Sequence, residues 1–236
     1  MSPFDWKEYW REKTDAGPRF TGEMFSSKRA REQAFHLEGG RSLLDFGCGT
    51  GDILFHLAAG FETVIGVDFS PAMLEKARGR MGALEGGGRV ALVVADESSV
   101  WERVPGTFDR IISTQVAQYL TRAQVERFFA KARERLNPGG RIIFFDVIDP
   151  GLCSMLELGL FCDRDVSWPR IVFRVLRRGL RRLARGLAGL PSSELGFAYR
   201  PGELRDLAAA QNLSFEHVWS LYYEYRYHAI LTPMAI

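Results

Sequence analysis

The chain has 236 residues, of which 46% are hydrophobic and 25% charged, and 31 basic against 29 acidic side chains leave a net charge of only +2. This composition is typical of one globular domain with room for an added lid, and nothing in the overall charge requires a nucleic-acid or membrane partner. The three cysteines are odd in number and lie at no metal-ligand spacing, which argues against a disulfide framework or a metal site and for a reducing compartment. The N-terminus does not resemble a signal peptide, and no apolar run reaches the roughly 18 residues that span a bilayer. We therefore expect a cytoplasmic protein that is not transmembrane.

Residues 1–40 are predicted to form an N-terminal helical lid segment. In "DWKEYWREK", Trp6, Tyr9 and Trp10 are spaced i, i+3 and i+4, which places them on one face of a helix. Such a helix either packs on the domain or closes over bound ligands. We expect it to act as a lid, with Tyr9 and Trp10 as candidate substrate contacts.

Residues 41–150 alternate between apolar runs and helical periodicity. Ser70 before Pro71, and Thr121 with Gln124, are typical helix starts, and "NPGG" (137–140) predicts a turn. Strands are predicted at 42–46, 63–68, 89–96, 108–114 and 141–148. Apolar strands separated by helices form a parallel sheet that is covered on both faces. The sequence therefore predicts a doubly wound α/β core over 41–150.

Acidic residues and glycines follow the predicted strands, at the sheet edge where such folds bind ligands. "LLDFGCGTGD" (43–52) supplies Asp45 and three glycines, the second strand ends at Asp68, and the third ends at Asp96. Three carboxylates without a nearby lysine or arginine argue against a phosphate site. They suit a ligand with an ammonium group, a ribose and an adenine amine, and S-adenosylmethionine has all three.

Five blocks in this order resemble the class I S-adenosylmethionine-dependent methyltransferases: "LLDFGCGTGD", "VIGVDFSPAMLEKAR", "VVADES", "FDRIISTQVAQYL" and "LNPGGRIIFFDVI". The resemblance implies a Rossmann-like sheet of seven strands, with S-adenosylmethionine as cofactor and S-adenosylhomocysteine as product. It also implies that Asp45 and Gly47 hold the methionine end, Asp68 the ribose and Asp96 the adenine amine. The predicted cofactor-binding residues are Asp45, Gly47, Cys48, Gly49, Gly51, Asp68, Phe69, Asp96, Glu97, Ser113, Thr114 and Gln115.

Some of these residues also have simpler interpretations. Phe69 can be an ordinary core residue, and Asp96 can be one of the acids that are common in polar loops. Cys48 has no basic neighbour in the sequence to activate its thiol, so we interpret it as a small space-filling residue and not as a nucleophile.

Residues 151–200 are predicted to be a helical lid insertion. The stretch from Arg170 to Arg185 holds seven arginines and no acid, with apolar residues between them at intervals of three and four. It is an amphipathic basic helix. Its arginines are either solvated on a lid or bind an anionic partner, which can be an acidic carrier, an anionic substrate or an anionic membrane surface.

Residues 201–236 are predicted to form a C-terminal helix and a β-hairpin that completes the sheet. No catalytic base stands out. Gln118, Tyr119 and His228 are candidates, with Gln118 and Tyr119 as substrate contacts at the mouth of the cleft. Gln118 stands where many relatives have a histidine, which argues against histidine-assisted O-methylation.

The sequence predicts an S-adenosylmethionine-dependent methyltransferase that acts by in-line displacement on a small-molecule, lipid or carrier-bound biosynthetic intermediate. One alternative is a nucleic-acid methyltransferase, which "STQVAQYL" (113–120) argues against because it lacks an Asn/Asp-Pro-Pro-aromatic motif. Another alternative is a protein of this fold that binds the cofactor without transferring methyl.

Overall fold

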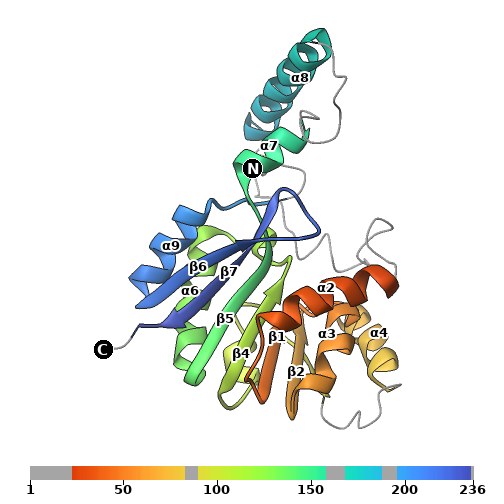
Figure 1. Ribbon diagram of the computed structural model, residues 1–236, viewed down its shortest axis with the longest axis vertical. Helices are drawn as coiled ribbons and strands as arrows, with labels where there is room; N and C mark the ends of the chain where they lie inside the picture. The colour runs from red at the N-terminus through yellow and green to blue at the C-terminus, as the bar shows by residue number, and fades with distance from the viewer. Residues whose placement is uncertain (1–22, 83–89, 158–167, 188–195, 235–236) are drawn as a thin grey trace.

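The computed structural model describes residues 23–82, 90–157, 168–187 and 196–234. Seven strands form one sheet in the order β3-β2-β1-β4-β5-β7-β6 (Figure 1). The strands are β1 (Ser42–Phe46), β2 (Thr63–Asp68), β3 (Val90–Val94), β4 (Phe108–Thr114), β5 (Leu136–Ile148), β6 (Leu213–Trp219) and β7 (Arg226–Pro233). The first five are parallel, whereas β7 runs antiparallel to both β5 and β6. The predicted doubly wound, mostly parallel seven-stranded sheet is confirmed.

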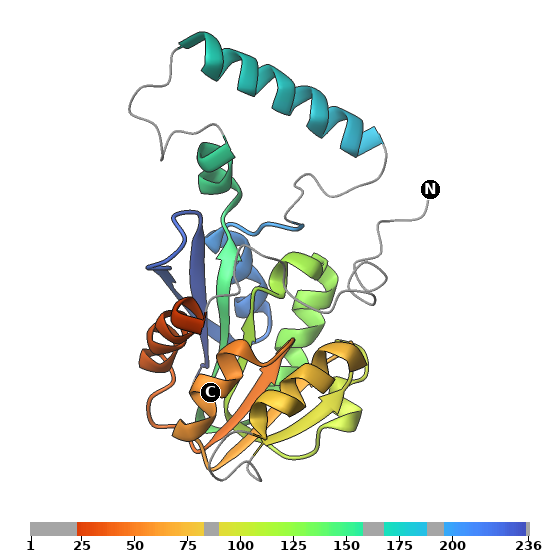
Figure 2. The ribbon, with the colours of Figure 1, turned by 90° about the vertical axis from the view of Figure 1, so that its right-hand side faces the viewer.

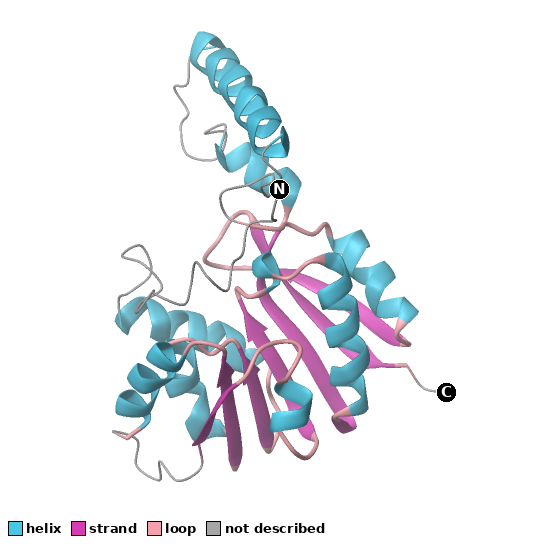
Figure 3. Cartoon of the chain, turned by 180° about the vertical axis from the view of Figure 1, so that it is seen from behind, coloured by secondary structure: helices cyan, strands magenta, loops and turns pink. Residues whose placement is uncertain are grey.

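Helices cover both faces of the sheet (Figures 1 and 3). Neighbouring strand residues point to opposite faces, so Leu43 packs in one core and Leu44 in the other. One core lies under α2 (Glu23–Phe35), α3 (Asp52–Leu57) and α4 (Pro71–Met81), and the other under α5 (Val100–Arg103), α6 (Arg122–Glu134) and α9 (Pro201–Ala210). This arrangement leaves the carboxyl ends of β1, β2, β3 and β4 at one edge of the sheet.

The predicted helix starts are confirmed. Ser70 Oγ accepts a hydrogen bond from the Met73 amide at the start of α4, and Pro71 occupies the first turn. Thr121 and Gln124 form a reciprocal capping box at the start of α6.

Two predicted boundaries are wrong. Residues 137–140 form no separate turn, because Leu136 already pairs with Phe108 and the extra residues form a bulge inside β5. The sequence predicts the two C-terminal strands at 213–223 and 224–232, but residues 220–225 form the connection between them. A hydrogen bond from the Ser220 amide to the Arg226 carbonyl closes this connection.

The chain leaves the sheet after β5 for two helices before it returns at residue 196. These are α7 (Pro150–Glu157) and α8 (Trp168–Leu187), which stand on the side of the sheet where β5 ends (Figures 1 and 2). Among the described residues, no helix combines the length and apolar character that crossing a bilayer requires. Most of the predicted N-terminal lid, including Tyr9 and Trp10, lies outside the described residues.

Candidate active site

The glycine turn links β1 to α3, and its three glycines meet different surroundings. A Cβ at Gly47 would lie 2.2 Å from Val116 Cγ2, and a Cβ at Gly51 would lie 2.8 Å from Met81 Cε. No described atom outside the turn lies within 4 Å of a Cβ placed at Gly49. All three have positive φ angles, between 55° and 79°. Gly47 and Gly51 are therefore required by packing within the protein, whereas Gly49 presents its backbone to open space.

Asp45 is a buried acid at the end of β1. It is 2% exposed, and its Oδ1 has no hydrogen-bond partner among the described residues. Burial, followed by the charge of Asp68, raises the pKa of Asp45 to about 7. A buried carboxylate oxygen without a partner is costly for the folded protein. A cationic ligand at this oxygen would supply the missing partner.

Asp68 ends β2 and holds the turn in place. Its two carboxylate oxygens accept hydrogen bonds, each 2.9 Å long, from the amides of Gly49 and Ser70. Burial raises the pKa of Asp68 in spite of these hydrogen bonds. Because a carboxylate oxygen has more than one lone pair, each can also accept a hydroxyl of a ligand. Phe69, the next residue, is half-buried beside this carboxylate.

Asp96 and Glu97 follow β3. Asp96 Oδ1 accepts hydrogen bonds from the amides and hydroxyls of both Ser98 and Ser99, at 2.7–3.1 Å. Glu97 Oε1 accepts one from Gln124 Nε2 at 2.5 Å. Asp96 thus stabilises the turn into α5 and, like Asp68, combines a local structural role with its place at the edge of the sheet.

The end of β4 brings Ser113, Thr114 and Gln115 to the same edge. Ser113 Oγ donates to the carbonyl of Phe46, the last residue of β1, at 3.0 Å. Gln115 has a φ of 59°, which is rare for a residue other than glycine and turns the chain out of the strand. The predicted cofactor-binding residues therefore lie along the carboxyl ends of β1 to β4, as this fold class requires of a ligand site.

Cys48 has a packing role. Its Sγ would lie 3.0 Å from a Cβ at Gly66, so it fills the space beside β2. Burial, followed by the charges of Asp45 and Asp68, raises the pKa of the thiol well above its usual value. The thiol is therefore protonated at neutral pH and is a poor nucleophile.

Comparisons with known proteins agree with this geometry. Residues 43–140 match the family described as "Methyltransferase domain". The chain is 30% identical over 146 residues to an uncharacterized methyltransferase of Bacillus cytotoxicus; the match covers 62% of this chain and 59% of that relative. Residues 43–140 are thus similar in sequence to a methyltransferase domain. The matched region thus spans about three fifths of the curated relative.

Solved structures share the fold of this chain over a longer part of its length. Magnesium protoporphyrin IX methyltransferase from Synechocystis PCC 6803, solved with bound S-adenosylmethionine, has a TM-score of 0.59 at 13% identity and covers 98% of this chain and 93% of its own. The pyocyanin biosynthetic protein PhzM has a TM-score of 0.61 at 21% identity and covers 97% of this chain and 61% of its own. At these identities the likeness concerns the fold.

Next to the predicted site lies a buried cluster of charged side chains around Asp146 of β5. Asp146 Oδ2 accepts hydrogen bonds from Arg29 of α2 at 2.6 Å and from Gln115 at 3.3 Å, and Oδ1 accepts one from Ser220 at 3.1 Å. Burial acts to raise the pKa of this carboxyl, but the positive groups around it, led by Arg29, outweigh burial and lower it. Asp146 has a φ of 57° where β5 and β7 shift register.

The sequence interpretation assigned no role to this cluster. A signal was present, because an acid inside the apolar run "IIFFDVI" must be paired if the strand is buried. Its partners come from α2, from the end of β4 and from Ser220 before β7, which are far away in the sequence, so their identity required the fold.

His228 of β7 belongs to this cluster and not to an open cleft. It is fully buried, its Nδ1 accepts a hydrogen bond from the Asp146 amide at 3.2 Å, and its Nε2 lies 2.9 Å from Glu32 Oε1. Both ring nitrogens thus face groups of the protein. This environment favours a structural role over the catalytic role that we considered.

Gln118 and Tyr119 lie beside the end of β4, on the short helix Ala117–Tyr119. Gln118 Nε2 donates to the Tyr119 hydroxyl at 2.6 Å, and Gln118 Oε1 accepts from Arg226 at 3.1 Å. The Gln118 carbonyl accepts a hydrogen bond from the Phe197 amide, where the chain returns from the helical insertion. Gln118 therefore connects β4, β7 and the returning segment, and Tyr119 is the half-buried member of the pair.

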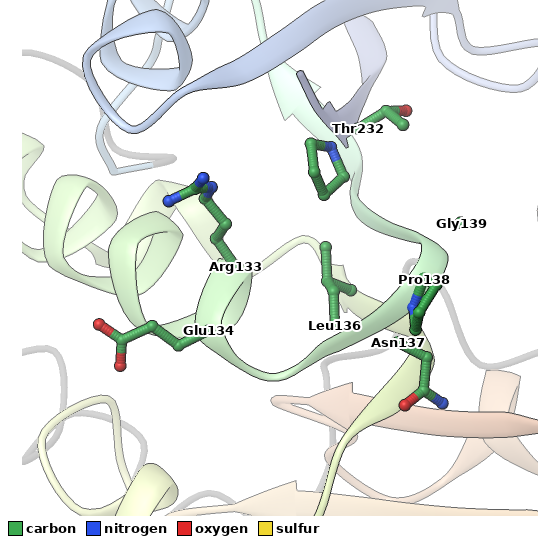
Figure 4. A pocket seen from close by; sticks show the side chains of 8 residues that line it. Arg133, Glu134, Leu136, Asn137, Pro138, Gly139 and Thr232 are labelled. Atoms are coloured by element: carbon green, nitrogen blue, oxygen red, sulfur yellow. The ribbon is translucent and has the colours of Figure 1, made fainter. Parts of the chain in front are cut away.

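A separate pocket of about 350 Å³ lies at the opposite edge of the sheet, where β5 begins and β7 ends (Figure 4). Arg133, Leu136, Asn137, Pro138 and Thr232 are among the residues that line it. Ligands of doubly wound sheets bind at the other edge. We therefore do not assign the cofactor to this pocket. Among the described residues, no group of three or more His, Cys, Asp and Glu side chains could hold a metal ion.

Proposed function

We propose that this protein transfers the methyl group of S-adenosylmethionine to a small-molecule acceptor. Two observations carry the proposal. The Oδ1 atom of the buried Asp45 carboxylate has no hydrogen-bond partner among the described residues, and the backbone of Gly49, in the turn that follows β1, faces open space. A cationic amino-acid group fits both features, because it neutralises the carboxylate and needs an approach free of side chains.

The residues at the strand ends fit the other parts of the cofactor. Asp68 would accept hydrogen bonds from the ribose hydroxyls, and Phe69 would pack against the adenine. The Asp96 carboxylate would accept from the adenine amine, and the backbone of residues 113–115 would accept from the ammonium group. These assignments use backbone and carboxylate acceptors that the fold already holds in place through local hydrogen bonds.

When bound, S-adenosylmethionine supplies a methyl group on a good leaving group, and the acceptor takes it by in-line displacement. The protein then needs mainly to hold the acceptor in line and to exclude water. The half-buried Tyr119 is our candidate for contact with the acceptor, oriented by Gln118. A base is needed only for an acceptor that must lose a proton.

A small-molecule acceptor is favoured by the structural neighbours, of which one is a magnesium protoporphyrin IX methyltransferase and the other a pyocyanin biosynthetic protein. The loop after β4 also lacks the sequence motif of enzymes that methylate amino groups of bases.

The test combines binding with labelling. Calorimetry should show that S-adenosylmethionine binds the parent protein and the exposed-surface control Asp206→Asn equally, and that Asp45→Asn binds it at least tenfold more weakly. Methyl-labelled cofactor is then incubated with protein and cell extract, and the extract is separated into small-molecule, lipid, nucleic-acid and protein fractions. Label in the nucleic-acid or protein fraction would contradict the proposed acceptor class. Equal cofactor binding by the Asp45 variant would contradict the proposed site, and tight binding without label in any fraction would contradict methyl transfer.

A further inference from the structure

Helix α8 stands apart from the α/β body of the molecule. Figures 1 and 2 show it beyond α7, on the side of the sheet where β5 ends, separated from the helices that cover the sheet. Its 20 residues make a rod about 30 Å long.

One half of α8 is apolar and exposed. With 3.6 residues per turn, its Val and Leu side chains and Phe173 fall on one half of the helix circumference. Their exposed fractions lie between 47% and 80%, for Val172, Phe173, Val175, Leu176, Leu180, Leu183 and Leu187. Soluble monomers rarely present so continuous an apolar surface, which marks an interaction site.

The other half of α8 is basic. All seven arginines between Arg170 and Arg185 fall there, and the helix contains no acid. Because the whole chain has a net charge of only +2, the remainder of the chain is net negative, so the positive charge is concentrated on this helix. The complement of α8 must therefore offer both an apolar region and a plane of anions along its whole length.

We propose that α8 is an in-plane amphipathic helix that docks this protein on an anionic membrane surface. The boundary of a bilayer offers both complements in parallel, since acyl chains receive the apolar half and phosphate groups lie level with the arginines. A nucleic acid would satisfy the arginines but leave the leucines in water. The arginines also prevent this helix from spanning the bilayer.

The connection of α8 to the sheet gives this docking a consequence for the substrate. The chain enters the insertion at the carboxyl end of β5 and returns at residues 196–197. There the Phe197 amide donates a hydrogen bond to the Gln118 carbonyl. Docking through α8 therefore brings the sheet edge with the candidate active site toward the membrane. If the proposed function holds, the acceptor is an amphiphile that partitions into the bilayer.

The test is co-sedimentation of the full chain with vesicles, without substrate. Vesicles of phosphatidylcholine with about 30% phosphatidylglycerol should bind the protein at least tenfold more tightly than pure phosphatidylcholine, and the difference should shrink at high salt. The triple variant Leu176→Ser, Leu180→Ser, Leu183→Ser should weaken binding at least tenfold, and so should Arg177→Gln with Arg178→Gln. Matched controls are Phe35→Ser on α2 and Arg122→Gln with Arg127→Gln on α6, all exposed residues, and they should bind as the parent does.

Equal binding to neutral and anionic vesicles would overturn the proposal, and so would α8 variants that bind like the parent. Sedimentation velocity identifies the main competing explanation: a dimer that the leucine variant converts to monomer, without vesicle binding, would make this face an interface between copies of the chain. These outcomes do not depend on cofactor binding or methyl transfer, so the docking proposal and the proposed function can fail separately.

Discussion

The Asp146 carboxylate in β5 accepts a 2.6 Å hydrogen bond from the Arg29 guanidinium in α2, across 117 residues of sequence, and both side chains are buried. This ion pair fixes α2 against the end of the sheet beside the predicted site. A buried pair adds little net stability compared with apolar residues, but loss of one partner leaves a buried charge uncompensated.

We therefore expect Asp146→Asn to lower the free energy of unfolding by about 3–5 kcal/mol, measured by urea denaturation. Because the pKa of Asp146 is lowered, the stabilisation from its ionisation is fully present above its usual pKa of about 3.9 and is lost as the pH falls through the lowered value. The exposed control Asp206→Asn should change stability by less than about 0.5 kcal/mol. A loss below about 1 kcal/mol for the Asp146 variant would show that the pair is not a structural tie.

Cofactor affinity should depend on pH through Asp45. Its pKa is raised to about 7, and a cationic ligand binds the ionised form. Affinity for S-adenosylmethionine should therefore rise about eightfold between roughly pH 6 and pH 7.5, as the ionised fraction increases. Calorimetry at several pH values measures this, and Asp45→Asn should bind weakly with no such dependence. If the affinity of the parent protein for S-adenosylmethionine does not change with pH, Asp45 does not contact the cationic group of the ligand.

The same residue should destabilise the cofactor-free protein. A pKa of about 7 in the folded state against about 3.9 in the unfolded state means that stability is lost as the pH rises from about 4 through 7, by up to about 4 kcal/mol. Asp45→Asn should thus raise the melting temperature of the cofactor-free protein above pH 7. A lower melting temperature for this variant would contradict the buried, ionised carboxylate.

Two glycine substitutions should have different effects. Gly49→Ala meets no described atom outside the turn within 4 Å, so it should lower the free energy of unfolding by only about 1–2 kcal/mol, from the positive φ, but weaken cofactor binding at least tenfold. Gly47→Ala places Cβ 2.2 Å from Val116 Cγ2 and should lower the free energy of unfolding by about 2–4 kcal/mol. Val116→Ala should rescue part of the Gly47 defect and none of the Gly49 defect, in a double-mutant cycle by chemical denaturation. Additive effects for both pairs would rule out the contact.

His228→Gln should act on stability and not on chemistry. The ring is fully buried, with its nitrogens facing Glu32 and Asp146, so the variant should lower the melting temperature while the pH dependence of kcat keeps its shape. If kcat of the variant no longer falls on one side of the pH optimum, His228 exchanges a proton during the reaction and the structural assignment is wrong.

Much of the fold followed from local signals. The apolar runs, Ser70 before Pro71 and the Thr121–Gln124 box each specify an element through interactions within a few residues, and each of these predictions is confirmed. The bulge inside β5 could not be predicted in this way, since "NPGG" has turn chemistry and only the pairing of Leu136 with Phe108 keeps the segment in the sheet. The position of the candidate site could be predicted from the same strand pattern, because parallel strands bring their carboxyl ends to one edge of the sheet.

The cluster around Asp146 was missed because its partners are distributed over the chain. Arg29 lies 117 residues before Asp146, and Arg226 lies 80 residues after it. No periodicity or spacing rule connects such positions. The sequence showed an acid in an apolar run, and the fold identified the groups that balance it.

The order of the last strands also bears on how the chain matures. β7 pairs with β5 along Ile142–Ile148, yet it follows α8 in the chain. During translation α8 therefore leaves the ribosome while β5 still has an unpaired edge. If α8 meets a membrane at that stage, the amphipathic helix could be in place before the sheet is complete, so that the protein finishes folding at the surface where it is proposed to work.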